Sequence, residues 1–414
     1  MTTIDSDIDG LVAEEATRLL AAYEAGSSFF FSSSRGMMLA RGVDATVPKT
    51  SCARADLPGR VREFLAGAAE FGRHNPVVVG AVPFGPNLPA HLVLPSEVVR
   101  ADPPAVAVPR SARGEAPRCS VRQVPSAAEY ERGVERVLRR FDDGDLSKVV
   151  LARTLELTPE SPVDVRDVLG NLALADPSGF TFAVDLPRRG EDGTRDTAGP
   201  QPPLGRTFLG ASPELLVSRR GTAVRSNPMA GSRPRSSDPA EDRRRAEELA
   251  DSDKDLREHA AVVEAVVRAL EPLCTDLRVP SRPSVISTAA MWHLATEITG
   301  ELRDPRTSSL ELADALHPTP AVCGTPVAAA RSVIGETEPF DRGYYAGMVG
   351  WCDAAGDGEW VVAIRCAEIE EEGLRLFAGA GIVAGSDPAD ELAETSAKFR
   401  TALSAMGLDQ AVSR

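Results

Sequence analysis

Short apolar runs alternate with longer amphipathic segments along the chain, and this pattern predicts both strands and helices. Apolar runs bounded by turn-forming residues predict buried strands at 75–84, 149–151 and 179–186. Helical periodicity predicts helices at 11–24, 127–144 and 238–274. Gly144 is expected to end the second helix as its C′ residue, and the third helix should break near Asp251.

The C-terminal half continues this mixture with short connections. We expect two strands across 207–231 that turn at Arg220 and Gly221, a hairpin across 347–369, and a strand, glycine loop and helix across 374–400. Pro- and Gly-rich composition predicts surface crossings at 100–118 and 187–206. Because strands are joined mostly by hairpins and helices come in blocks, the pattern predicts an α+β fold rather than repeating βαβ units.

Composition is that of an ordinary globular protein, and the charge excludes some partners. Hydrophobic residues make up 43% and charged residues 26% of the 414, and the net charge is −15. We expect no nucleic-acid or anionic-membrane partner, and an anionic substrate would need local positive groups or a metal. No apolar run approaches a membrane span, and the acidic N-terminus lacks the regions of a signal peptide. The six scattered cysteines, without a CxxC pair, predict reduced thiols in the cytoplasm.

Two titratable residues stand where the pattern predicts burial. Lys148 heads the apolar run 149–151, where an ammonium is costly because desolvation disfavours its charged form. Glu214, in GASPELLVS, enters an apolar strand just after Pro213. Burial would raise the pKa of Glu214 and suit it to proton donation, whereas an exposed glutamate at a strand end would need no function.

The helix that follows Ser252 carries polar groups in its apolar face. Asp255 and His259 fall within the apolar stripe around Val266, and Glu258 lies on the border of that stripe. Asp255 can be explained as part of the helix cap, His259 as a hydrogen-bonded core histidine, and Glu258 as an edge ion pair. Spacing alone therefore assigns no function to these three residues.

The last predicted helix, capped by Ser386, has charged residues along one side. Glu391, Glu394 and Lys398 recur at i, i+3 and i+7 beside an apolar stripe. A surface ladder of Glu–Lys pairs, each worth roughly 0.2–0.5 kcal/mol, is the explanation that spacing alone favours. The alternative is a pair of carboxylates that point into a site and are available as ligands of Mg²⁺.

Arg365 and a nearby glycine-rich run indicate anion binding. Arg365 lies among the alternating apolar residues of a predicted strand, where either a substrate carboxylate or an internal Asp or Glu could pair with it. The run FAGAGIVAG places Gly379, Gly381 and Gly385 between a strand and a helix. Because the spacing GxGxxxG differs from a dinucleotide fingerprint, we expect a loop whose backbone N–H groups approach a small anion.

Several motifs together resemble the chorismate-utilising enzymes, and most closely the isochorismate synthases. The motifs are SKVVLAR (147–153), GASPELL (210–216), MAGSRPR (229–235), SDKDLREH (252–259), HLATEITGEL (293–302), LHPTPAVCGTP (316–326), WVVAIRCAEI (360–369), AGAGIVAGSDP (378–388) and ELAETSAKF (391–399). They keep the family order, while 1–118 match loosely. The resemblance implies one α+β domain over 1–414, with packed antiparallel sheets, helices outside, and the catalytic core at 119–407.

The resemblance also implies a reaction and the residues that perform it. Water attacks C2 of chorismate while the C4 hydroxyl leaves from the far side of the diene. Lys148 resembles the general base that activates the water, and Glu214 resembles the general acid that protonates the leaving hydroxyl.

The same resemblance implies a metal and substrate contacts. Mg²⁺ would hold the ring carboxylate of the substrate. The positions that match metal ligands are Glu258 and Glu394, with Asp255 and Glu391 near them. The positions that match substrate-binding groups are Tyr345, Arg365, Gly379 and Lys398.

Three alternatives to an isochorismate synthase are open at this point. Ammonia-using anthranilate and aminodeoxychorismate synthases typically carry glutamine at the position of Lys148, so that lysine points away from them. A non-catalytic relative would not be expected to keep the whole catalytic set. Salicylate synthases usually carry threonine at the position of Ala321, and Ile364 also resembles the isochorismate synthases, so we expect isochorismate as the product. We further expect a monomer whose product passes to an isochorismatase or a pyruvate lyase, in siderophore or related synthesis.

Overall fold

The computed structural model describes residues 18–26, 28–49, 56–86, 88–102, 118–142, 144–176, 179–188, 204–288, 291–371 and 373–409. The helices in this part of the chain, besides a short turn of helix at 18–21, are α2 (Leu57–Glu70), α3 (Ala127–Asp142), α4 (Val165–Ala175), α5 (Pro239–Ala250), α6 (Asp253–Leu270), α7 (Ser309–Leu316), α8 (Val327–Thr337) and α9 (Pro388–Met406). No helix among the described residues is both long and apolar enough to cross a membrane.

The strands of the described residues form three sheets, in which every pairing is antiparallel. Sheet A has the order β18 (Gly324–Thr325), β8 (Lys148–Pro159), β22 (Gly373–Val383), β21 (Cys366–Glu370), β10 (Leu204–Ser212), β9 (Phe180–Pro187), β1 (Ser28–Ser33), β2 (Gly36–Arg41) and β6 (Glu97–Ala101), with β7 (Cys119–Val124) also beside β8. Sheet B has the order β14 (Cys274–Arg278), β17 (Ile298–Leu302), β12 (Ala223–Asn227), β11 (Leu215–Arg220), β20 (Gly358–Val362), β19 (Met348–Asp353), β4 (Val77–Val82), β5 (His91–Leu94) and β3 (Ala45–Thr46). Sheet C joins β13 (Met229–Pro234), β16 (Met291–Ala295) and β15 (Ser284–Ser287).

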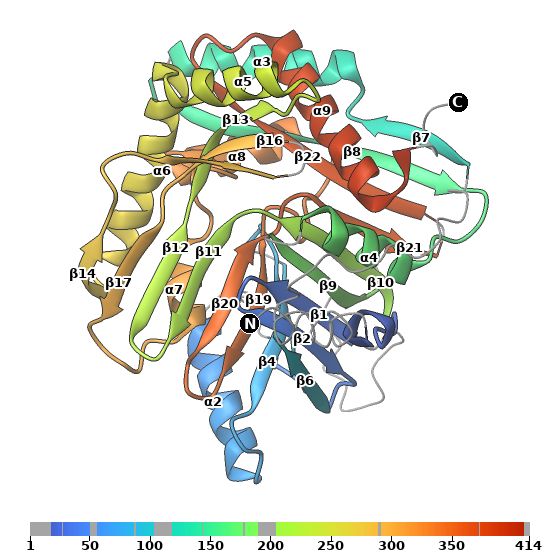
Figure 1. Ribbon diagram of the computed structural model, residues 1–414, viewed down its shortest axis with the longest axis vertical. Coiled ribbons are helices and arrows are strands. Elements are labelled where there is room, and N and C mark those ends of the chain that lie inside the picture. Colours follow the sequence, from blue (N-terminus) through green and yellow to red (C-terminus); the bar gives the residue numbers. More distant parts are fainter. Residues whose placement is uncertain are drawn as a thin grey trace, which may run out of the picture.

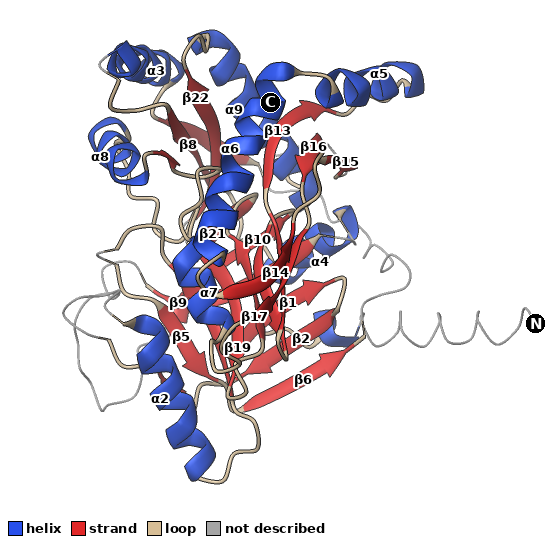
Figure 2. Ribbon diagram, turned by 90° about the vertical axis from the view of Figure 1, so that its left-hand side faces the viewer, coloured by secondary structure: helices blue, strands red, loops and turns tan. Residues whose placement is uncertain are grey.

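The two large sheets pack face to face, and helices cover the outside. Figure 1 shows α3, α5 and α9 above β8 and β22, with β11, β12 and β20 of sheet B on the left. In Figure 2, α6 and α7 lie along the outer side of sheet B, and α2 lies at the far end of the molecule from α3. The predicted α+β class with packed antiparallel sheets and outer helices is confirmed.

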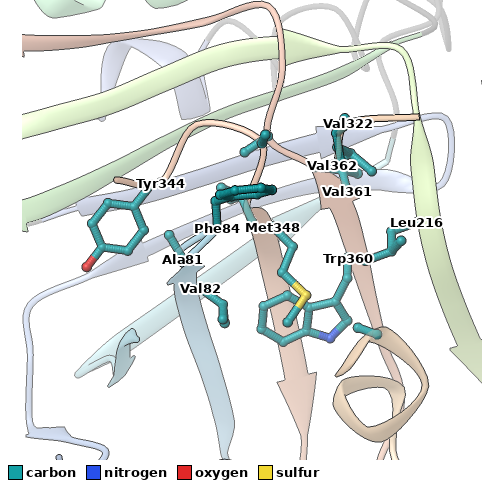
Figure 3. Close-up of a cluster of buried hydrophobic side chains, with 14 of the residues drawn as sticks. Ala81, Val82, Phe84, Leu216, Val322, Tyr344, Met348, Trp360, Val361 and Val362 are labelled. Atoms are coloured by element: carbon teal, nitrogen blue, oxygen red, sulfur yellow. The ribbon is translucent and has the colours of Figure 1, made fainter. Parts of the chain in front are cut away.

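The central strands of sheet A, such as β1 and β9, are buried on both faces, which explains their continuous apolar runs. Phe29 and Phe31 of β1 belong to the core between the two sheets, whereas Phe30 belongs to a second core under α4 and α9. Successive side chains of a strand point to opposite faces, so only a strand covered on both sides is apolar throughout. Figure 3 shows part of the core between the sheets, where Met348 lies beside the fully buried Trp360.

Several predicted elements are confirmed at or near their expected bounds. These are the strands β4, β8 and β9, the helix α3, the pair α5 and α6 with a break at 251–252, and the turn at Gly221, which has a φ of 61°. Gly144 has a φ of 78° just past α3, as expected of a residue that ends a helix. The five cysteines among the described residues are free thiols.

Other predictions were wrong because the chain changes sheets over very few residues. The segment 207–231 holds parts of β10, β11, β12 and β13, which belong to three sheets, instead of two strands. The 347–369 segment forms the expected β19–β20 hairpin, but β21 lies in sheet A. The expected surface loop 187–206 ends in β10, where Arg206 is buried, and 189–203 lie outside the described residues. So do 11–17 of the first predicted helix and 103–117 of the predicted crossing at 100–118.

Candidate active site

A cavity of about 170 Å³ lies where β8 and β22 meet α6, α9 and sheet C. Its lining includes Glu214, Lys254, Asp255, Glu258, His293, Ala321, Tyr345, Arg365, Gly379, Gly381, Glu391, Glu394 and Lys398. The fold therefore brings together all the predicted site residues except Lys148, which lies directly behind Glu258.

A larger cavity, of about 910 Å³, lies elsewhere and has a different character. It shares no lining residue with the first cavity, and several of its charged groups contact other lining residues. The Arg100 guanidinium lies over the Trp351 ring at 4.5 Å, and Asp353 accepts a hydrogen bond from Asn75 at 3.0 Å. The smaller cavity is therefore the candidate active site.

Lys148 is buried at the start of β8, as the sequence predicts. Its Nζ donates to Glu258 Oε1 at 2.7 Å, which gives the buried ammonium an anionic partner. Gly381 of β22 makes room for this pair, because a Cβ at that position would lie 3.2 Å from both Glu258 Oε1 and Lys148 Cε. The pair joins the strand that carries the lysine to the helix that carries the carboxylate.

Glu214 stands just before β11 and is only 3% exposed, so the alternative of an exposed strand end was wrong. Burial raises the pKa of Glu214 to about 8, although the Met229 backbone N–H and the Lys148 ammonium act in the opposite direction. Glu214 therefore carries a proton at neutral pH. A neutral carboxyl group that lines a cavity can donate that proton to a ligand.

Four carboxylates line one side of the cavity: Asp255 and Glu258 from α6, and Glu391 and Glu394 from α9. Asp255 does not close the predicted capping box with its side chain. Ser252 caps α6 by accepting from the Asp255 N–H, while the Asp255 carboxylate accepts from Arg233 at 2.8 Å. The backbone N–H of Asp255 therefore takes part in the helix cap, while its side chain lines the cavity.

Glu391 and Glu394 do not form a surface ladder, although the i,i+4 pair of Glu394 with Lys398 is present at 2.6 Å. Glu391 is buried, and burial raises its pKa to about 6, with repulsion from Glu394 adding to the effect. Burial alone would raise the pKa of Glu394, but Lys398, Lys254 and Arg365 lower it overall. The cap of α9 is Asp387 and not Ser386, because Asp387 accepts from the N–H groups of 389 and 390.

The donor set fits a magnesium ion. All four side chains offer carboxylate oxygens, the ligands that Mg²⁺ prefers, and each ion-paired carboxylate uses only one oxygen in its ion pair. Among the described residues no three His, Cys, Asp or Glu side chains converge closely enough to hold a metal by themselves. Mg²⁺ usually takes one or two carboxylates and completes its shell with water and substrate oxygens, so this arrangement suits it.

Arg365 is not part of a strand, contrary to the prediction. It is the last of three residues that cross from β20 in sheet B to β21 in sheet A, and its φ is 52°. Its guanidinium faces the cavity and makes no hydrogen bond or ion pair with any described residue. Burial lowers the pKa of Arg365 and the nearby Glu394 charge acts in the opposite direction, but no acid among the described residues lies within ion-pair distance of it.

Of the glycine-rich run, Gly385 lies in the expected turn between β22 and α9, with a φ of 85°, but Gly379 and Gly381 lie within a strand instead of a loop. Gly379 and Gly381 pair with Ala152 and Val150 of β8, so their backbones belong to the sheet. A Cβ at Gly379 would lie 2.8 Å from the Tyr345 hydroxyl. This glycine therefore admits the Tyr345 side chain, whose ring stacks on Phe377 with centroids 5.0 Å apart.

The remaining predicted contacts line the same cavity. Lys398 Nζ donates to the Gly379 carbonyl at 2.8 Å as well as to Glu394, so its ammonium is fixed against β22. Ala321 lies on a turn in which the Val322 N–H donates to the Thr319 carbonyl. The Ala321 methyl group presents no hydrogen-bonding group to the cavity.

The sequence prediction gave no role to His293, which the structure places in the lining. Burial, with Arg365 and Lys398 nearby, lowers the pKa of His293 to about 3, and its Nε2 has no hydrogen-bond partner among the described residues. His259, by contrast, is the core histidine that was expected, with its Nε2 2.7 Å from Thr296 Oγ1. The HLATEITGEL motif contained the only sequence signal for His293.

Comparisons with known proteins show the family to which the chain belongs. A family model described as "Chorismate binding enzyme" matches residues 105–407. The isochorismate synthase DhbC of Bacillus subtilis (strain 168) is 51% identical over 405 residues, which are 97% of this chain and 99% of that protein. The isochorismate synthase EntC of Escherichia coli (strain K12) is 36% identical over 408 residues, which are 97% of this chain and 100% of that protein.

A solved structure extends the likeness to three dimensions. The crystal structure of the putative 2,3-dihydroxybenzoate-specific isochorismate synthase DhbC from Bacillus anthracis superposes with a TM-score of 0.86 at 49% identity. It covers 95% of this chain, and this chain covers all of it. Anthranilate synthase component I from Streptococcus pneumoniae has a TM-score of 0.62 at 20% identity, which shows a shared fold and no more.

Proposed function

This chain belongs to the chorismate binding enzymes, and from that premise we propose that it is an isochorismate synthase, an isomerase that converts chorismate into isochorismate. The relatives at 51% and 36% identity bear this name and match over nearly their whole lengths. One observation in the structure carries the proposal. A single cavity holds a carboxyl group kept protonated by burial, four carboxylates, and Arg365, which makes no hydrogen bond or ion pair with any described residue, with the Lys148–Glu258 pair behind it.

The proposed reaction exchanges one hydroxyl position for another without net oxidation. Water adds at C2 of chorismate, the double bonds shift, and the C4 hydroxyl leaves as water. In its neutral amine form, Lys148 accepts the proton of the attacking water, and Glu214 donates its proton to the departing hydroxyl. Glu214 suits this role because burial keeps it protonated at neutral pH.

The carboxylates and cations of the lining would hold a dianionic substrate from two directions. Glu258 and Glu394 would hold Mg²⁺, with Asp255 and Glu391 beside them, and the bound ion would neutralise the ring carboxylate of chorismate. The Arg365 guanidinium would receive the enolpyruvyl carboxylate, since no described residue pairs with it. Tyr345 and Lys398 would flank this contact.

Ala321 favours isochorismate as the released product. A salicylate synthase makes the same intermediate and then expels pyruvate, and a hydroxyl group at this position could orient that elimination. Ala321 cannot supply a hydroxyl group. We propose that isochorismate leaves the enzyme and feeds the synthesis of 2,3-dihydroxybenzoate for siderophores. The vibriobactin-specific isochorismate synthase of Vibrio cholerae is 42% identical over 92% of this chain.

Chromatography of the products tests the function. Purified protein, chorismate and Mg²⁺ at neutral pH should give a mixture of chorismate and isochorismate. Salicylate should appear only when a separate pyruvate lyase is added. Salicylate and pyruvate from the protein alone would support the salicylate synthase instead, and anthranilate formed with ammonia would support the ammonia-using enzymes. A cytoplasmic location and a monomeric state stay predictions.

A further inference from the structure

We propose that Gly210 is a positioning residue that holds the substrate-binding Arg365 in the cavity. By carrying no side chain on β10, Gly210 lets the backbone of Arg365 take a left-handed conformation, and this backbone directs the guanidinium, which no described residue holds by a hydrogen bond or an ion pair. The inference deepens the proposed function and rests on it, because it concerns the residue that would receive the substrate carboxylate.

The conformation of Arg365 is unusual for a residue with a side chain. Its φ of 52° lies in the left-handed region, which non-glycine residues seldom occupy and which is found mostly where the surrounding structure enforces it. The left-handed conformation of Arg365 is imposed by a short connection between two sheets. The chain has only 363–365 in which to pass from β20 in sheet B to β21 in sheet A.

Hydrogen bonds fix the crossing on both sides. The Arg365 carbonyl accepts from the Ala211 N–H at 3.1 Å, and the Ala363 carbonyl accepts from the Ala346 N–H at 2.8 Å. Ala346 is itself left-handed, with a φ of 57°. The turn at Arg365 is therefore clamped between β10 and the segment that follows Tyr345.

Gly210 is the point at which β10 touches this turn. It pairs with Cys366 in the ladder of β10 and β21. A Cβ at Gly210 would lie 2.8 Å from the Arg365 carbonyl oxygen, 2.8 Å from Cys366 Cβ and 2.9 Å from Cys366 Cα. These distances are shorter than real Cβ contacts, and none of the three atoms can move away by a side-chain rotation. An alanine there must displace the backbone of Arg365 and Cys366.

A displacement of the Arg365 backbone would also displace the Arg365 guanidinium. The Arg365 side chain makes no hydrogen bond or ion pair with any described residue that could hold it in place. Its position in the cavity therefore follows from its backbone. Displacing a binding group by about 1 Å can cost as much as 10²-fold in rate, so even a small shift should be measurable.

The experiment compares Gly210→Ala with Gly373→Ala. Gly373 lies in β22 of the same sheet, and a Cβ there would lie 2.6 Å from the Leu157 carbonyl oxygen, but the residues that this Cβ would meet do not line the cavity. Both variants should lower the melting temperature. Gly210→Ala should raise the KM for chorismate by roughly tenfold or more with a smaller change in kcat, as expected when a substrate-binding interaction is lost. Gly373→Ala should keep the wild-type KM.

Equal KM values in the two variants would overturn the inference. Failure of the wild-type protein to convert chorismate would instead overturn the proposed function. A second pair of variants tests the strain even if Gly210→Ala does not fold. Because glycine tolerates a positive φ and alanine does not, Arg365→Gly should melt at a higher temperature than Arg365→Ala. An Arg365→Ala protein at least as stable as Arg365→Gly would contradict the backbone strain on which the inference depends.

Discussion

Lys148 Nζ lies 2.7 Å from Glu258 Oε1, so the ammonium at the head of β8 is paired with a carboxylate that lines the cavity. The pair explains how a lysine can be buried at a strand end, and it links the proposed base to the proposed metal site. The first prediction concerns this lysine.

Lys148→Ala should lower kcat by about 10²–10⁴-fold, the usual contribution of a general base, while the fold is retained. Lys148→Arg is the matched variant. Its guanidinium can still pair with Glu258 but stays protonated and cannot act as a base. Both variants should therefore be inactive in a steady-state assay, with wild-type circular dichroism. Near-wild-type kcat in either variant would refute the assignment of Lys148.

Activity should fall on the alkaline side of neutrality as Glu214 loses its proton. Because burial raises the pKa of Glu214 to about 8, the acid form predominates below that pH and is lost above it. A profile of kcat/KM against pH, which reports the free enzyme, should therefore have a descending limb near pH 8. Glu214→Gln should abolish turnover. A variant that keeps full activity, or a profile flat to well above that pH, would remove Glu214 from the mechanism.

Activity should require Mg²⁺, be lost in EDTA and return when Mg²⁺ is added in excess. Glu394→Gln should need a much higher Mg²⁺ concentration for half-maximal activity, or fail outright, because one proposed ligand loses its charge. Glu264→Gln is the control, since Glu264 lies on the exposed side of α6 in a surface pair with Arg268. Titration calorimetry with MgCl₂ measures the binding directly. Full activity in metal-free buffer would disprove the metal assignment.

Glu338→Gln should destabilise the protein strongly. Glu338 and Arg342 form an ion pair with both side chains 3% exposed, and Arg342 also donates to the carbonyls of Val150 and Val322 beside the cavity. Removing one charge leaves the other buried without its partner, which costs about 3–5 kcal/mol. Glu264→Gln should cost only about 0–1 kcal/mol. Urea denaturation measures the free energy of unfolding of both variants and tests this prediction. Equal losses of free energy would show that the buried pair stabilises the protein no more than the surface pair does.

The sequence predicted the site better than the fold around it. Lys148 and Glu214 were marked by the mismatch between their charge and their apolar surroundings, and both are buried. Such a mismatch is local and needs no knowledge of the tertiary structure. The roles of Glu258 and Glu394 could not be obtained in this way, since spacing favoured surface pairs and only the family resemblance pointed to a site.

Errors arose where one continuous apolar pattern in the sequence spans strands of two different sheets. The alternating residues around Arg365 predicted one continuous strand, but the chain crosses from sheet B to sheet A there, and periodicity carries no signal for such a crossing. Gly379 and Gly381 were mistaken for a loop because glycine also occurs in strands where another side chain approaches closely. His293 was missed because a buried histidine on a strand looks like ordinary core.

The central claim is that this protein makes isochorismate by adding water to C2 of chorismate, and labelled water tests it most directly. Chorismate is converted briefly in water enriched in heavy oxygen, with Mg²⁺ present, and the product is analysed by mass spectrometry and NMR. The account predicts isochorismate that carries one heavy oxygen atom, in its C2 hydroxyl group. Isochorismate without the label would show that the C4 hydroxyl moves within the molecule, and it would contradict the roles proposed for Lys148 and Glu214.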